Sequence, residues 1–184
     1  KVDKFQPRSF NMGLSKNAFE ASNGFGNIHP GEDPDLSIRL WNLGFRTKLI
    51  KEAFVYHKRR ISWEKFQIQV NKFGKARPIL NSWYPQHTKI TFWFPSLFLL
   101  GFVVSVLLTF VKFPYFLGLY VLYFGLLFGS SLLMNKSFKI AAYSVYAAII
   151  QFYGYGKGFV LSFYKIFVLK LEPQKAFPEL FFKK

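Results

Sequence analysis

Three acidic side chains stand close together in the run Gly31, Glu32, Asp33, Pro34 and Asp35. Pro34 suits the first position of a helix and Asp33 suits its N-cap. The positive end of a helix dipole stabilises an ionised carboxylate placed there. Such a carboxylate could take the proton from an attacking hydroxyl within hydrogen-bond reach. Asp33 is thus a candidate general base, and the alternative is that it serves only as a helix cap.

A second chemical candidate is His57, which precedes the cations Lys58, Arg59 and Arg60. An imidazole there could bind a divalent metal, while the guanidinium groups neutralise phosphates. The alternative is a surface histidine beside a cationic run that faces anionic lipid.

Several short elements must position these side chains. Residues 16–22 predict a short helix that ends at Asn23 and Gly24 in a left-handed cap. Pro34 begins a second helix of about ten residues that Gly44 stops, and its leucines lie on one face suited to packing against a sheet. Residues 46–50 and 53–56 then predict short strands that lead to His57.

An amphipathic helix is predicted over residues 62–74. Trp63, Phe66, Val70 and Phe73 recur at spacings of three, four and three. This apolar face suits either a membrane surface or packing on the soluble part of the chain, because periodicity does not identify what the face meets.

Composition divides the chain into two halves. The 184 residues carry 25 Lys and Arg against 9 Asp and Glu, a net charge of +16, yet 51% of the residues are hydrophobic. This apolar content excludes a disordered polycation. The absence of cysteine excludes disulfides and thiolate chemistry. The apolar residues are concentrated after residue 90.

Two apolar runs are long enough to cross a bilayer. Residues 92–111 contain only Ser96, Ser105 and Thr109 as non-apolar side chains, and residues 113–134 carry no charge. A third run, residues 140–163, is interrupted by Lys157 and glycines, so it is either a broken helix or a re-entrant hairpin.

The positive-inside rule places the first half in the cytoplasm, because residues 57–89 carry many cations beside the first span. Three complete crossings would place the basic tail outside, whereas a re-entrant third segment would return it to the cytoplasm. The chain begins with Lys and shows no signal peptide. We therefore expect the C-terminal portion of a larger membrane enzyme.

The order of these pieces resembles the membrane-anchored family 2 glycosyltransferases. The string GEDPDLSIRLWNLGF is followed by predicted strands, YHKRR, a helix with FGKARP, and spans that begin FPSLF, and GYGKG lies in the last apolar run. In that family an ED pair supplies the catalytic base, and Asp33 matches it. A histidine after the next strands can complete the metal and diphosphate site, and His57 occupies that place.

The resemblance implies an α/β fold, with residues 1–90 as the C-terminal part of a cytoplasmic GT-A domain. Residues 91–164 would form a membrane region of two to three helices, and residues 165–184 a basic tail. The nucleotide-binding βαβ region and the DxD motif would lie upstream, so this fragment alone is expected to be inactive. The QxxRW motif of processive synthases has no match, which does not favour polymer synthesis.

The implied reaction is inverting transfer from a nucleotide-sugar donor to a lipid-linked or saccharide acceptor at the cell membrane, in polysaccharide or glycolipid synthesis. Mg²⁺ or Mn²⁺ would neutralise the leaving diphosphate. Glu32 would position the acceptor, Arg59 and Arg60 would contact phosphates, and Trp63 would stack on a sugar or on the acceptor.

Two other classes compete with this interpretation. A non-enzymatic transport or export subunit would explain the spans and the cations, but the spans contain no isolated acid that would mark an ion pathway. Nucleic-acid binding would fit the charge, yet lipid headgroups account for cations beside membrane spans. We therefore expect no nucleic-acid partner.

Overall fold

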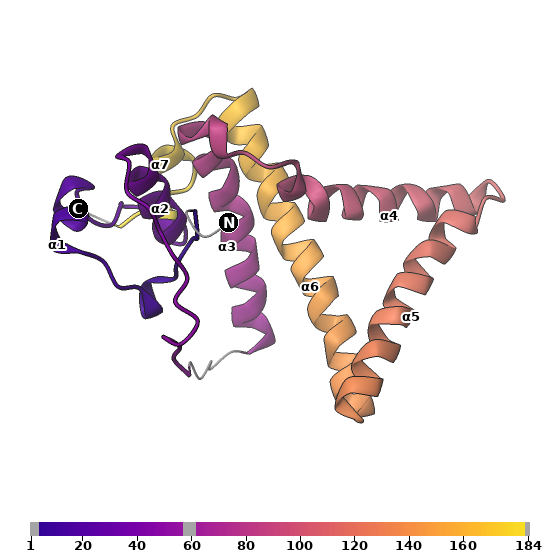
Figure 1. The fold of residues 1–184 in the computed structure, drawn as a ribbon. Coiled ribbons are helices and arrows are strands. Elements are labelled where there is room, and N and C mark those ends of the chain that lie inside the picture. The colour runs from indigo at the N-terminus through magenta and orange to yellow at the C-terminus, as the bar shows by residue number, and fades with distance from the viewer. Residues whose placement is uncertain (1–3, 57–61, 183–184) are drawn as a thin grey trace. The chain divides into compact units, whose positions relative to one another are not determined.

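The computed structural model describes residues 4–56 and 62–182, and they divide into two compact units. The first unit contains residues 4–56, 76–88 and 162–182, and the second contains residues 62–75 and 89–161. The helices α3 (Trp63–Trp83) and α6 (Phe138–Phe163) each contribute residues to both units. Figure 1 shows the order of the helices along the chain.

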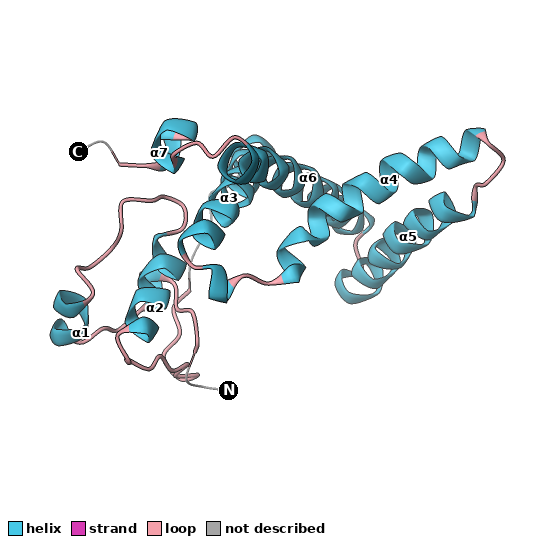
Figure 2. Ribbon diagram, turned by 90° about the horizontal axis from the view of Figure 1, so that it is seen from above, coloured by secondary structure: helices cyan, strands magenta, loops and turns pink. Residues whose placement is uncertain are grey.

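The predicted α/β fold is wrong for the part of the chain that the structure describes. Figure 2 shows helices and loops with no strand in those residues, and residues 46–50 and 53–56 are not strands. Two isolated bridges replace a sheet, a parallel one between Lys4 and Thr47 and an antiparallel one between Ile28 and Phe181. A strand needs neighbours that pair with it along its length. Within residues 46–56 only Thr47 forms a β-bridge, and its partner is the single residue Lys4.

The helices α1 (Lys16–Ala21) and α2 (Glu32–Asn42) form one small core of the first unit. The Ser15 side chain caps α1, and Asn23 and Gly24 follow it with positive φ, as predicted. Gly44, with φ 84°, ends α2, where the Phe45 amide donates to the Leu40 carbonyl over 3.0 Å. The buried side chains Leu36, Leu40 and Ala18 make up this core. The packing partner of α2 is thus α1 and its flanking loops, and the expected sheet is wrong.

A second core of the first unit gathers the end of α3 and the C-terminal segment. That segment contains a π-helical turn (Tyr164–Val168), α7 (Pro173–Ala176) and a 3-10 turn (Pro178–Leu180). Its buried side chains meet those of Ala76 and Ile79 around Ile28, and the cluster comprises Ile28, Ala76, Ile79, Ile166, Ala176, Phe177 and Leu180. Residues that are far apart in the sequence therefore build one hydrophobic core.

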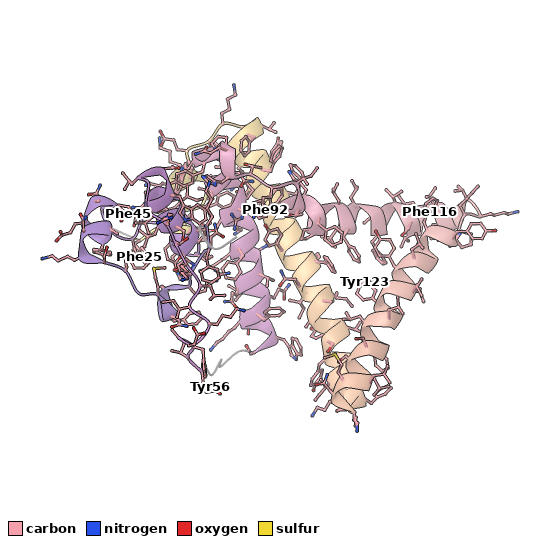
Figure 3. All side chains as sticks on the ribbon, viewed as in Figure 1. Phe25, Phe45, Tyr56, Phe92, Phe116 and Tyr123 are labelled. Atoms are coloured by element: carbon pink, nitrogen blue, oxygen red, sulfur yellow. The ribbon has the colours of Figure 1, made fainter. Side chains whose placement is uncertain are left out.

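Two helices of the second unit are long and apolar enough to cross a membrane. They comprise Ile90–Phe110, which joins a 3-10 turn (Ile90–Trp93) to α4 (Phe94–Phe110), and α5 (Tyr115–Asn135). Only 11% and 6% of their apolar windows are buried. Exposed aromatic side chains stand along both helices, including Phe116 and Tyr123 (Figure 3). These bounds agree closely with the two predicted apolar runs.

The third apolar run lies in one continuous helix, α6, so the expected broken helix or re-entrant hairpin is wrong. The glycines of α6 bring other helices close. Gly158 lies against the backbone of Asn71 and Lys75 in α3, and the Asn71 side-chain amide donates to the Gly154 carbonyl over 3.0 Å. Gly156 lies against the start of α4, where the Ser96 hydroxyl donates to its carbonyl over 3.3 Å. The GYGKG stretch is therefore a helix-packing surface of the second unit.

We predict that Gly158→Ala destabilises the second unit by roughly 1–3 kcal/mol, because its Cβ would meet backbone atoms of α3 that cannot rotate away. Gly129→Ala is the matched control, since a Cβ there meets nothing within 4 Å. The measurement is the thermal unfolding midpoint of the purified protein in detergent. Equal midpoints for the two variants would contradict the close packing of α3 on α6.

Candidate functional site

The acidic run begins α2, although not in the predicted register. Gly31 is the N-cap, with φ 133°, and Glu32 is the first helical residue. Asp33 therefore lies inside the first turn and is not the N-cap, and Pro34 stands at the third helical position. The correction follows from Gly31, whose missing side chain allows a left-handed backbone that turns the chain into the helix two residues earlier than Asp33 would. Proline is tolerated there because the first amides of a helix have no helical partner.

The Asp33 carboxylate is nearly buried and has two different neighbours. Its Oδ1 atom accepts a hydrogen bond from the Ser9 backbone amide over 3.1 Å. Its Oδ2 atom lies 4.0 Å from the Arg8 guanidinium. The side chain of Asp33 is 12% exposed, whereas that of Arg8 is 62% exposed. One oxygen is thus fixed to the backbone, and the other faces a cation at the surface.

Glu32 is held by its own turn and by a histidine. Its Oε2 atom accepts the Gly31 amide over 2.8 Å, and its Oε1 atom lies 3.0 Å from His29 Nδ1. The two acids of the ED pair are therefore both ordered at the start of α2, each through a different part of the chain.

Asp35, two residues further on, anchors a buried network. Its Oδ2 atom accepts two hydrogen bonds from Arg39, from Nε over 3.1 Å and from Nη2 over 2.8 Å. The same guanidinium donates to the carbonyls of Ser22 and Gly24. Asp35 Oδ1 accepts the Tyr84 hydroxyl over 2.6 Å. This network fastens α2 both to the turn after α1 and to the chain after α3.

Tyr84 has a pKa raised above its ordinary value of 10.0. Desolvation by burial is the largest cause, and the hydrogen bond to Asp35 and the charge of Asp35 add to it, while Arg39 opposes them. Tyr84 therefore stays a neutral donor toward Asp35 at ordinary pH.

The remaining predicted site residues lie outside the described residues or in the second unit. His57, Arg59 and Arg60 lie outside the described residues. Trp63 belongs to the second unit, where its ring packs edge-on against Tyr143 and Tyr146 with centroids 5.5 and 4.8 Å apart. Within residues 4–56 and 62–182, no three His, Asp or Glu side chains cluster as a metal site would require.

Sequence reasoning did not select several residues that surround the acids. The spacing of four between Asp35 and Arg39 is a recognisable helical pair, and the spacing of three between His29 and Glu32 is another. Ser9 and Tyr84 lie 24 and 49 positions from their acidic partners. No local pattern could have identified those two.

The chain belongs to the family described as glycosyl transferase family group 2, whose model matches residues 10–155. The match covers the acidic run, α3, both candidate membrane spans and most of α6. It confirms the family to which the order of motifs pointed. No curated protein and no solved structure was found to match the chain.

We predict that raising the pH above about 10 destabilises the protein in part through Tyr84. The pKa of Tyr84 is higher in the folded state than in the unfolded state, so the folded state holds the proton more tightly. The contribution of Tyr84 to stability is therefore complete below its pKa in the unfolded state and is lost as the pH rises through its pKa in the folded state. At pH 8 the free energy of unfolding of Tyr84→Phe should be about 1–3 kcal/mol lower than that of the parent protein, because the hydrogen bond to a carboxylate is missing. At pH 11 the difference between the two free energies should be smaller.

The measurement is the denaturant unfolding of both proteins at pH 8 and pH 11. Tyr56→Phe is the control, because Tyr56 is 95% exposed. A difference between parent and Tyr84→Phe that stays constant over this pH range would exclude the Tyr84 contribution.

Proposed function

We propose that the protein transfers a sugar from a nucleotide-sugar donor to a hydroxyl of a lipid-linked or saccharide acceptor, with inversion, in the synthesis of a cell-surface polysaccharide or glycolipid. Family membership supports glycosyl transfer. The observation that carries the site is the pair Glu32 and Asp33, ordered side by side in the first turn of α2.

In this proposal Asp33 is the general base. Its Oδ1 atom accepts a hydrogen bond from the Ser9 amide, so Oδ2 is the oxygen that remains to accept a proton. The acceptor hydroxyl would approach past the exposed Arg8 side chain and give its proton to Oδ2. The hydroxyl oxygen forms a bond to the anomeric carbon as the bond from that carbon to the diphosphate breaks. The diphosphate leaves with the bonding electrons from the opposite face of the sugar.

Other parts of the proposal rest on the family resemblance alone. Glu32 would position the acceptor, Arg59 and Arg60 would contact phosphates, and Trp63 would stack on a sugar or lipid-bearing acceptor. Mg²⁺ or Mn²⁺, with His57 among its ligands, stays a prediction. The described residues do not form a metal site by themselves.

Asp33→Asn in the full-length protein should lower kcat by at least about 10²-fold, because the amide cannot take the proton. Donor KM and the unfolding midpoint should change little. The assay is sugar transfer in lipid with a panel of nucleotide sugars and Mg²⁺ or Mn²⁺. Glu20→Gln, an exposed acid in α1, is the control.

Turnover by Asp33→Asn at the parent rate would remove Asp33 as the base. Failure of the parent protein to turn over any donor would instead favour the non-enzymatic export subunit.

We also propose a membrane topology with two crossings and a cytoplasmic first unit. Residues 4–56 precede the candidate spans, residues 162–182 follow them, and both share one core around Ile28. Segments packed in one core lie on the same side of a membrane, so the chain between them must cross an even number of times. The two candidate spans satisfy this condition. A cytoplasmic tail is therefore favoured over three complete crossings, and α6 would not cross the membrane.

Single cysteines test this topology, because the chain has none of its own. In a cysteine-free full-length background, Lys112→Cys, between the spans, should react with a membrane-impermeant maleimide on intact cells. Glu20→Cys and Gln174→Cys should react only after permeabilisation. Labelling of Gln174→Cys on intact cells would show an odd number of crossings.

A further inference from the structure

The C-terminal segment contacts the chain immediately before the acidic pair. We propose that residues 176–182 are a positioning element that holds residues 27–31, and through them the Glu32 carboxylate and the start of α2, in the arrangement needed for transfer. This inference rests on the proposed function of Glu32 and Asp33.

Backbone hydrogen bonds join the two segments in register. The His29 amide donates to the Leu180 carbonyl over 2.7 Å, and the Phe182 amide donates to the Asn27 carbonyl over 3.1 Å. Ile28 and Phe181 form the antiparallel bridge between these bonds. The contact therefore fixes residues 27–29 along the chain direction as well as in space.

Side-chain burial makes this contact part of a core. Ile28 and Leu180 are fully buried and Phe177 is 2% exposed, all in one cluster. The Lys165 ammonium donates to the Ala176 carbonyl over 3.2 Å and lies 4.8 Å from the centre of the Phe177 ring. The segment is thus anchored at both of its ends.

The fixed residues lead directly to Glu32. The His29 ring lies 3.0 Å from Glu32 through Nδ1, and its centroid lies 5.9 Å from that of Phe182. Gly31, the N-cap of α2, faces the Ile28 side chain. Removing residues 176–182 would free His29 and Gly31 together, and with them the carboxylate of Glu32.

This arrangement predicts a specific kinetic effect. Misplacing catalytic groups by about 1 Å can lower a rate by as much as 10²-fold. Nucleotide binding is expected from residues upstream of this chain. Displacement of residues 176–182 should therefore lower kcat and leave donor KM almost unchanged.

The first experiment tests the contact without an activity assay. Ile28→Cys and Phe181→Cys, combined in a cysteine-free full-length protein in lipid, should form a disulfide under mild oxidation, because bridged antiparallel residues lie within disulfide distance. Ile28→Cys with Lys112→Cys is the control pair. Absence of the Ile28 to Phe181 cross-link would overturn the proposal.

The second experiment tests the effect on catalysis. Leu180→Asp places a charge in the core and should abolish the cross-link, lower kcat on the order of tenfold and leave donor KM within about twofold. Leu169→Asp is the matched control, because Leu169 is 49% exposed. Leu180→Met should retain both the cross-link and kcat.

Misfolding of Leu180→Asp would by itself lower kcat, so a third experiment removes the segment from protein that has already folded. A protease site placed at residues 170–172 allows residues 173–184 to be released from the purified enzyme, and the synthetic peptide should restore kcat when added back. Loss of the segment with unchanged kcat would overturn the proposal. Full activity of Asp33→Asn would instead overturn the proposed function, so the two failures are distinguishable.

Discussion

The pairing of residues 27–29 with residues 180–182 is the interaction on which the first unit depends. It brings together segments separated by about 150 positions, and it places the fully buried Ile28 among side chains from α3 and the C-terminal segment. The start of α2 follows three residues later, so this pairing lies immediately before the acidic pair. A local helix cap could not provide this constraint, because the capping residue is Gly31 and has no side chain.

Two kinds of environment divide the molecule. In the first unit, the side chains of Asp35, Arg39 and Tyr84 form a polar network in which each is hydrogen-bonded to another. Such a network is stable only when every buried donor and acceptor has a partner. In the second unit, long apolar helices leave most of their surface exposed, and close contacts are made at glycines. The first pattern suits a domain in water and the second suits helices in lipid.

Much of the local structure could be predicted from the sequence. The cap at Asn23 and Gly24, the stop at Gly44 and the two apolar helices all follow from short-range rules, and the structure agrees with them. Two of the expectations that failed did so for definite reasons. Residues 46–56 have the composition of strands but lack partners for a sheet among the described residues. Asp33 is of a residue type that is common at N-caps, but Gly31, with its positive φ, is the N-cap and the helix begins earlier.

By itself the sequence determined the family of this protein, the two apolar helices and the proximity of Glu32 to Asp33, because each depends on residues that are neighbours in the chain. Only the tertiary structure decided which groups contact those acids. Ser9 donates to Asp33, Tyr84 donates to Asp35, and Leu180 accepts from His29 just before α2, so three distant segments meet around the acidic run. Their contacts depend on how buried surfaces fit together across the first unit, and that fit leaves no periodic or local signal in the sequence.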